Sequence, residues 1–137
     1  MKKTYREYQI PNIKYQIEEY SMETIFSKII RKEIPADIVY EDEEILAFKD
    51  IYPLAPVHVL IIPKREIESI NDLEDDDALL VGRMIISAKN IARDLNISEK
   101  GYKLLFRTGR DGGQEVQHIH LHLIGGARLS EDIHPVK

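Results

Sequence analysis

The chain has 137 residues, of which 43% are hydrophobic and 31% are charged, and this length and balance are typical of one globular domain. Its formal net charge of -5 gives no overall attraction for a polyanion, which argues against a nucleic acid partner. Cysteine is absent, which excludes disulfides, thiol catalysis and thiolate metal ligands. No stretch approaches the roughly 20 apolar residues of a membrane-spanning helix, so we expect a cytoplasmic protein without a membrane partner.

The first elements follow a polar N-terminal segment. Residues 1–21 mix tyrosines with charged residues, and Pro11 interrupts any helix there, so we expect a mobile or peripheral extension. Residues 22–137 are expected to form the domain. The apolar spacing within Thr24–Glu33 predicts a short amphipathic helix that ends before Pro35.

Three strands are predicted in the next segment. Asp37–Glu41 and Ile45–Lys49 are rich in Ile, Val, Tyr and Phe, and the acidic residues between them suit a turn. Asp50–Pro56 contains two prolines and is predicted as a loop, and Val57–Ile62 is a β-branched run that closes at Pro63.

The second half of the chain predicts one long helix and two further strands. A helical apolar stripe runs from Leu79 to Leu95, after a group of acids at 72–77 that suits a helix N-terminus better than a metal site. Tyr102–Arg107 and Val116–Ile124 read as strands around the glycine-rich turn Gly109–Gly113. Neighbouring strands with one long helix between them predict the α+β class with an antiparallel sheet.

Three of the five histidines alternate with aliphatic residues in the last predicted strand. Because side chains alternate along a strand, His118, His120 and His122 should share one face, which we expect to line a cleft or solvent. The other face can pack on the long helix and carries Ile119, Leu121 and Leu123.

A metal site is one alternative for this histidine cluster. Residues i and i+4 of a strand lie about 13 Å apart, and zinc binds nitrogen at about 2.1 Å, so one ion cannot easily take all three. A site with two of these histidines, His58 and a carboxylate stays open. Chance placement of surface histidines is the weaker alternative, given the alternation.

Nucleophilic catalysis fits the cluster better, because a neutral imidazole is a competent nucleophile near pH 7. The central His120 has a histidine on either side, so His118 or His122 can act as an acid or as electrostatic support. The preceding Gly112-Gly113 permits close backbone approach to a phosphate, although alone it reads as a hairpin turn.

The segment His118–Ile124 resembles the signature of the histidine-triad family, in which three histidines alternate with apolar residues. Several further segments between residues 22 and 128 resemble its Hint branch; they are Thr24–Ile30, Ala47–Ile51, Ala55–Lys64 and Asp111–Gln114.

The resemblance implies a five-stranded antiparallel sheet with one long and one short helix, and a homodimer that continues the sheet. It also implies hydrolysis of purine nucleoside 5′-phosphoramidates or acyl-nucleotides through a nucleotidyl-His120 intermediate, with no metal or other cofactor. The partner is then a purine nucleotide, an AMP or GMP derivative, with Asp50 at the ribose hydroxyls. An apolar base pocket is implied, built from Ile25, Phe26, Ile29, Phe48, Ile51 and Leu60. The residues implied around the phosphate are His58, Gln114, His118 and His122, and the backbone at His118 is expected to orient the His120 ring. Gly113, Glu115 and Val116 are expected among the nucleotide-binding residues.

Some positions depart from the family pattern. Arg107 stands where the family commonly has a phosphate-binding Asn, and its charge can hold phosphate with a different geometry. Glu115 stands where some relatives have Ser, and an acid there repels phosphate unless it points away or pairs with Arg107. Thr24 and Ser27 replace a zinc-binding Cys pair of some relatives, which predicts no structural zinc. The C-terminus lacks the Trp of animal relatives, so leaving-group specificity is not transferred.

Two other functions remain as alternatives. Another branch of the same family contains dinucleoside polyphosphate hydrolases and nucleotidyltransferases, but the Gly112-Gly113-Gln114 and Gly125-Gly126 segments look more like the Hint branch. A nucleotide-binding module with weak catalysis is the second alternative, because Arg107 and Glu115 change the residues expected around the phosphate.

Overall fold

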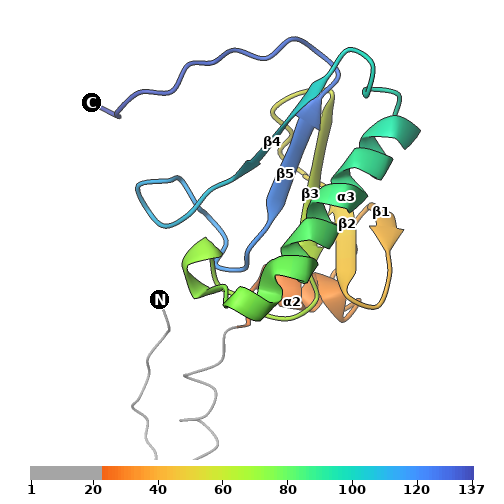
Figure 1. Cartoon of the computed structure of the whole chain (residues 1–137), viewed down its shortest axis with the longest axis vertical. Coiled ribbons are helices and arrows are strands. Elements are labelled where there is room, and N and C mark those ends of the chain that lie inside the picture. The colour runs from red at the N-terminus through yellow and green to blue at the C-terminus, as the bar shows by residue number, and fades with distance from the viewer. Residues whose placement is uncertain (1–22) are drawn as a thin grey trace, which may run out of the picture.

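The computed structural model describes residues 23–137, so the expected extension at residues 1–21 lies outside the described residues. Within the described part, two α-helices, two 3-10 turns and five strands follow one another (Figure 1). In chain order they are α2 (Ile25–Ile30), β1 (Ile38–Glu41), β2 (Ile45–Lys49), β3 (Val57–Pro63), η1 (Ile70–Asp72), η2 (Asp75–Asp77), α3 (Ala78–Asp94), β4 (Tyr102–Phe106) and β5 (Leu121–Gly125).

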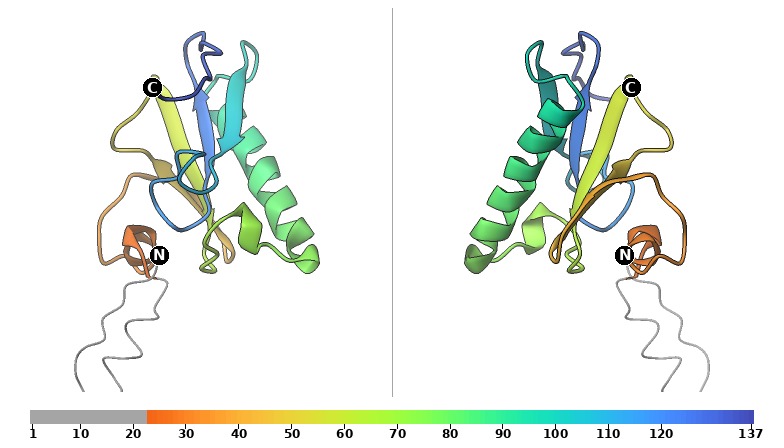
Figure 2. Two further views of the ribbon diagram at one scale, coloured as in Figure 1. Left: turned by 90° about the vertical axis from the view of Figure 1, so that its left-hand side faces the viewer. Right: turned by 90° about the vertical axis from the view of Figure 1, so that its right-hand side faces the viewer.

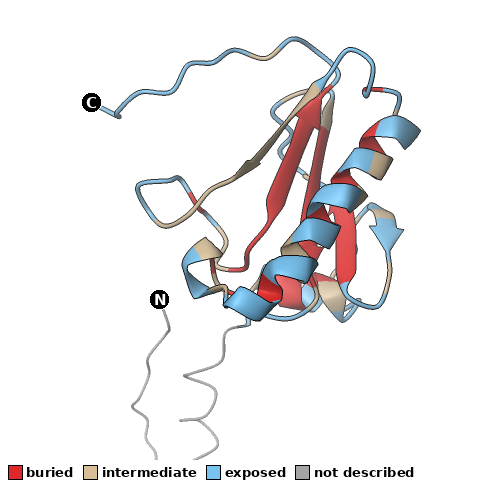
Figure 3. Ribbon diagram, in the orientation of Figure 1, coloured by how far each residue is buried: buried red, intermediate tan, exposed pale blue. Residues whose placement is uncertain are grey.

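The five strands form one sheet in the order β1-β2-β3-β5-β4, and every neighbouring pair is antiparallel. The predicted α+β class with a five-stranded antiparallel sheet is therefore confirmed. β5 lies between β3 and β4, and in that register His122 pairs with Leu60 on β3 and with Leu105 on β4. The last strand, which carries one of the motif histidines, thus lies inside the sheet, where it is buried on both sides (Figure 3).

Each face of the sheet packs against a different helix, as the two side views show (Figure 2). α3 covers one face with a buried stripe that includes Met84 and Ala88, packed on the β-strand residues Val59, Ile61 and Leu123. On the opposite face, α2 covers part of the sheet, and its apolar side chains join alternate residues of β2 and β3 in a second buried cluster; this cluster contains Phe26, Ile29, Leu46, Phe48, Leu60 and Ile62. Because the sheet is covered on two sides, its central strands β3 and β5 are apolar except for His58 and His122.

The last strand is shorter than predicted, because it begins at Leu121 instead of Val116. The residues before it are held by contacts outside the sheet ladder. The backbone N–H of Ile119 donates to the Ile67 carbonyl at 2.7 Å, and the ring of His118 bonds to the Pro63 carbonyl at 2.8 Å. His118 and His120 therefore precede the strand, and a single regular histidine face does not form.

Two further details at the helix ends differ from the prediction. α2 has a side-chain cap at its start, whereas α3 has no side-chain cap hydrogen bond at its N-cap residue Asp77. The hydroxyl of Thr24 caps α2 by accepting from the Phe26 N–H at 3.1 Å, but the helix ends at Ile30, because Lys32 adopts a left-handed backbone with φ 64°. The acids expected in the first turn of the long helix instead lie just before it, in η2. There, the Asp77 carboxylate accepts from the Glu74 N–H and pairs with Arg65.

None of the helices within residues 23–137 has both the length and the apolar character that a membrane crossing needs.

The core of the sheet should be sensitive to truncation at Leu123, which is fully buried and pairs with Val59 and Leu104 on the two neighbouring strands. We expect Leu123→Ala to lower the free energy of unfolding by about 2–5 kcal/mol through lost burial and the cavity left behind. Urea denaturation measures this change. Ile133→Ala in the C-terminal tail is the matched control, because Ile133 is 87% exposed and its truncation should change stability by less than about 0.5 kcal/mol. Equal effects of the two variants would contradict this packing.

Candidate active site

A cavity of about 610 Å³ opens beside α2 and the ends of β2, β3 and β5. Fourteen of the sixteen site residues named from the sequence lie in its wall. The wall comprises Ile25, Phe26, Ile29, Ile34, Pro35, Ala36, Phe48, Lys49, Asp50, Ile51, Tyr52, Leu54, His58, Leu60, Arg107, Gly113, Glu115, Val116, His120 and His122.

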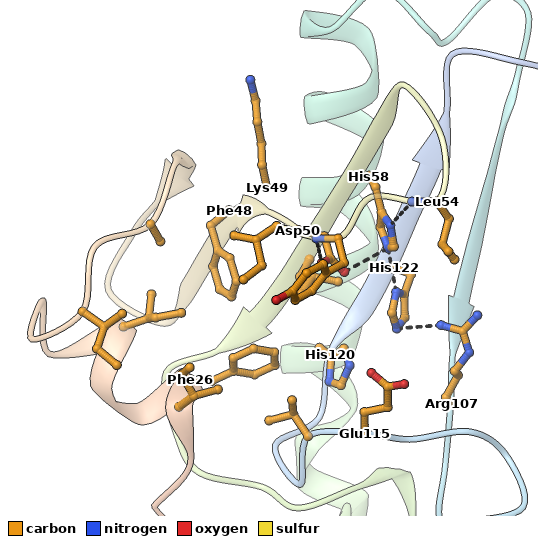
Figure 4. Close-up of a pocket in the computed structure, with 18 of the residues that line it drawn as sticks. Phe26, Phe48, Lys49, Asp50, Leu54, His58, Arg107, Glu115, His120 and His122 are labelled. Atoms are coloured by element: carbon orange, nitrogen blue, oxygen red, sulfur yellow. Dashed lines mark hydrogen bonds and ion pairs between the residues drawn. The ribbon is translucent and has the colours of Figure 1, made fainter.

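One end of the cavity is apolar and is formed by side chains from α2 and the sheet (Figure 4). The ring of Phe26 packs edge-on against Phe48, with ring centroids 5.4 Å apart, and against His120, at 5.1 Å. Four of the six residues named for a base pocket belong to a core cluster and to the cavity wall at once; they are Phe26, Ile29, Phe48 and Leu60. Ile25 and Ile51 line the cavity but are exposed. A flat aromatic ligand can be held there by apolar burial and ring packing.

His120 lies where this apolar end meets the polar residues of the cavity. Its Nδ1 lies 2.7 Å from the backbone carbonyl oxygen of His118. A carbonyl can only accept, so Nδ1 carries the proton and the Nε2 of a neutral His120 holds the free lone pair. The backbone of His118 therefore selects the tautomer of His120.

His122 and His58 are linked on the next part of the wall. His58 Nε2 and His122 Nδ1 are 3.0 Å apart, although the residues are 64 positions apart in the sequence. The backbone N–H of Leu54 donates to His58 Nδ1 at 3.0 Å. On the far side of His122, a guanidinium nitrogen of Arg107 lies 3.2 Å from Nε2.

Asp50 directly follows strand β2 and lies beside this histidine pair. Its carboxylate accepts from the Tyr52 N–H at 2.8 Å and lies 3.5 Å from His58 Nε2. The backbone also fixes the position, because the Asp50 N–H donates to the His58 carbonyl at 2.9 Å. One carboxylate is thus held at the cavity wall between the apolar end and the histidines.

Two residues expected around the phosphate, His118 and Gln114, do not line the cavity. The His118 ring is 1% exposed and turns into the protein toward the Pro63 carbonyl, and its Nδ1 has no hydrogen-bond partner among residues 23–137. Gln114 is buried and ties loops together, because it accepts from the Gly109 N–H and donates to the carbonyls of Glu68 and Val116. Both expectations are corrected: these side chains support the wall from behind.

Six wall residues were not found from the sequence. Ile34, Pro35 and Ala36 lie in the connection after α2, and Lys49, Tyr52 and Leu54 flank Asp50 and His58. Their closeness in sequence to predicted site residues was the one signal that could have identified them, because loop residues without a motif show no periodic pattern. The contribution of Leu54 is a backbone N–H, which no side-chain motif can indicate.

Burial keeps the histidines of the site neutral. It is the main cause that lowers the pKa of His58, His118 and His120, although the Asp50 carboxylate opposes the shift at His58 and His120. For His122, burial and the nearby His120, Arg107 and His58 lower the pKa to about 3. The cavity therefore presents uncharged imidazoles near neutral pH.

Asp50, His58 and His122 also meet the simplest test for a metal site, because their ligand atoms all lie within 4.8 Å of one another. A metal-bound histidine normally donates its second N–H to an acceptor. Here the second nitrogens face donors instead, the Leu54 N–H behind His58 and the Arg107 guanidinium behind His122. These surroundings do not suit a bound cation.

Comparison with known proteins identifies the family. The sequence model of the protein family described as the HIT domain matches residues 31–129 of this chain. A purine nucleoside phosphoramidase of Escherichia coli is 55% identical over 107 residues, covering 78% of this chain and 90% of that protein. A HIT-like protein of Synechococcus elongatus is 48% identical over 110 residues, covering 80% and 96%.

Solved structures agree with these matches. A HIT family hydrolase from Legionella pneumophila superposes with a TM-score of 0.78 at 51% identity, covering 80% of this chain and 97% of that one. A histidine triad nucleotide-binding protein from Candida albicans gives 0.69 at 30% identity, covering 84% and 87%. The family model, the sequence identities and the shared fold together show that this chain belongs to the HIT family and is a hydrolase of that family.

Proposed function

We propose that this protein hydrolyses purine nucleoside 5′-phosphoramidates or acyl-nucleotides through a covalent nucleotidyl intermediate on His120. The observation that carries the proposal is the bond from His120 Nδ1 to the His118 carbonyl, which leaves a neutral Nε2 lone pair in a cavity with an apolar end. The name of the Escherichia coli relative, purine nucleoside phosphoramidase, supports this substrate class.

In the proposed reaction, the purine occupies the apolar end between Phe26 and Phe48, and the Asp50 carboxylate accepts hydrogen bonds from the ribose hydroxyls. This placement brings the α-phosphorus to His120, whose Nε2 forms a bond to phosphorus while the bond to the leaving group breaks. An amine leaving group takes the bonding electron pair and gains a proton from solvent, whereas a carboxylate leaves with the pair and needs no proton. Water then attacks phosphorus, the N–P bond breaks, and the nucleoside monophosphate is released.

The same residues distinguish this proposal from a nucleotide-binding module. Binding alone requires the apolar end and Asp50, but it does not require a fixed tautomer at His120. The hydrogen bond that orients His120 therefore favours catalysis. A dinucleoside polyphosphate would react at His120 by the same chemistry as the proposed substrates. It would differ from them in needing room for a second nucleoside.

We further propose that the chain forms a homodimer through β4 and acts in the cytoplasm. β4 is an edge strand of the sheet and its five residues are only partly buried. A half-buried edge with unpaired backbone groups favours pairing with a second copy, which continues the sheet.

Light scattering during gel filtration tests the dimer. We expect a mass of about twice the 15.9 kDa of one chain, independent of nucleotide. A mass of one chain at micromolar concentration would contradict the dimer and would leave the chemistry at His120 unaffected.

The intermediate is tested by intact-mass measurement after rapid mixing with adenosine 5′-phosphoramidate. We expect a transient nucleotidyl adduct and release of AMP, and we expect His120→Ala to abolish the adduct and to reduce turnover by at least about a thousandfold, because the nucleophile is removed. His134→Ala is the matched control, since this exposed histidine lies in the tail and should leave both signals unchanged. Turnover by wild type without any adduct, or full activity of His120→Ala, would contradict the proposal.

The lowered histidine pKa values predict that acid reduces the stability of the fold before it reduces the rate of adduct formation. A neutral buried histidine has a folded pKa below its unfolded value of about 6.5, so its contribution to stability is complete above that value and is lost as pH falls toward the folded pKa. The free energy of unfolding should therefore fall between pH 7 and pH 5, by up to about 1.4 kcal/mol per pH unit for each such histidine. The rate of adduct formation should persist below pH 6.5, because His120 stays neutral.

Urea denaturation and single-turnover rates at several pH values measure the two effects. His122→Asn should reduce the pH dependence of stability, whereas His134→Asn should preserve it. A flat stability profile over this range would show that the site histidines are protonated as easily as free ones.

A further inference from the structure

Arg107 lies in the wall of the cavity and has no role in the proposed reaction. It follows β4, and its aliphatic stem packs on Gly113, where an added Cβ would lie 3.4 Å from Arg107 Cδ. The guanidinium lines the cavity (Figure 4). Among residues 23–137, no carboxylate oxygen forms an ion pair with it within 4.0 Å.

A count of protons along the histidine chain fixes what faces this guanidinium. Because the Leu54 N–H donates to His58 Nδ1, a neutral His58 carries its proton on Nε2. That proton has two acceptors within reach, His122 Nδ1 at 3.0 Å and the Asp50 carboxylate at 3.5 Å. With the nearer acceptor, His122 Nδ1, a neutral His122 carries its own proton on Nε2. Nε2 lies 3.2 Å from a guanidinium nitrogen of Arg107, and that nitrogen is also a donor. Two N–H donors therefore meet here, and an oxygen atom of a ligand can accept from both.

The position of this donor pair along the cavity decides which ligand atom it meets. Contacts run in order from the apolar end to Arg107: Phe26 to His120, His120 to His122 at 4.9 Å between ring centroids, and His122 to Arg107. With a base beside Phe26 and phosphorus at His120, the group bound beyond phosphorus lies at the donor pair. In an in-line displacement the leaving group departs from the side of phosphorus opposite the attacking Nε2, so it meets the donor pair when that side faces Arg107.

We propose that Arg107 and His122 form a binding site for a leaving-group oxyanion, so that this enzyme prefers nucleotides whose α-phosphorus carries an acid, such as a carboxylate, over nucleotides that carry an amine. This inference rests on the proposed function, because it assumes attack by His120. A guanidinium donates charge-assisted hydrogen bonds that strengthen as the oxygen gains charge. It repels an amine once that amine is protonated.

The electron balance separates the two substrate classes. With an acyl-nucleotide, His120 Nε2 forms the N–P bond, the P–O bond breaks, and its electron pair leaves on the carboxylate, which needs no proton. Water then replaces His120 on phosphorus, and its proton passes to solvent. An amine leaves with the P–N electron pair and must gain a proton. Because the pKa of His122 is lowered to about 3, little imidazolium exists near neutral pH to supply that proton.

Glu115 opposes this effect, since its carboxylate lines the same wall and repels an anionic leaving group. It forms no ion pair with Arg107 within 4.0 Å among residues 23–137, so each charge acts on the ligand separately. Removal of the charge at Arg107 and removal of the charge at Glu115 should therefore shift the leaving-group preference in opposite directions. The two variants control for each other in the test.

The experiment compares two AMP derivatives, acetyl-adenylate and adenosine 5′-phosphoramidate, by kcat/KM and single-turnover rate, with spontaneous hydrolysis subtracted. Arg107→Gln should lower the ratio of acetyl-adenylate to phosphoramidate activity by at least about tenfold, the size of one lost charge-assisted hydrogen bond, and Arg107→Lys should restore part of it. Glu115→Gln should raise the ratio. Arg110→Gln is the matched control, because the Arg110 side chain is 95% exposed and pairs with Asp111.

Three results would overturn the inference. Equal losses for both substrates in Arg107→Gln would overturn the inference, because they would place Arg107 on the α-phosphoryl group that the substrates share. An unchanged ratio would overturn it as well, and so would an equal shift in Arg110→Gln. If wild type hydrolyses neither substrate and forms no adduct, the proposed function fails and the inference fails with it.

Discussion

The site depends on one hydrogen bond, from His120 Nδ1 to the backbone carbonyl of His118. That carbonyl is held because the segment before β5 is anchored twice, by the His118 ring on the Pro63 carbonyl and by the Ile119 N–H on the Ile67 carbonyl. A strand in this segment would place its carbonyls in a ladder. The irregular backbone instead gives one carbonyl to a side chain and thereby directs the lone pair of His120 into the cavity.

The same fold also explains why the histidines are neutral. The cavity lies against a sheet that is covered by α2 on this face and by α3 on the other, so the imidazoles are removed from water. Burial lowers the pKa of each one, and the mutual proximity of His120, His122 and Arg107 adds to the shift at His122. Burial of these histidines also has a cost in stability, because the buried His118 Nδ1 has no hydrogen-bond partner within the described part of the chain.

Much of the fold was predictable from the sequence, because alternation and helical periodicity report burial directly. The strand runs and the long helix follow from those patterns, and so does the placement of Leu121 and Leu123 against α3. The start of β5 was not predictable, since the pattern of alternation continues into Val116–His120 although tertiary hydrogen bonds hold that segment outside the sheet. The inward turn of His118 was missed for the same reason.

The most direct test of this account is the tautomeric state of each histidine, measured by nitrogen NMR of the ¹⁵N-labelled full-length protein at neutral pH. The account predicts a neutral His120 protonated on Nδ1, and neutral His58 and His122 protonated on Nε2. A His120 protonated on Nε2, or an imidazolium at His120 or His122, would contradict it, because the cavity would then lack the lone pair that we propose as the nucleophile, or the donor pair of Arg107 and His122 would have a different origin.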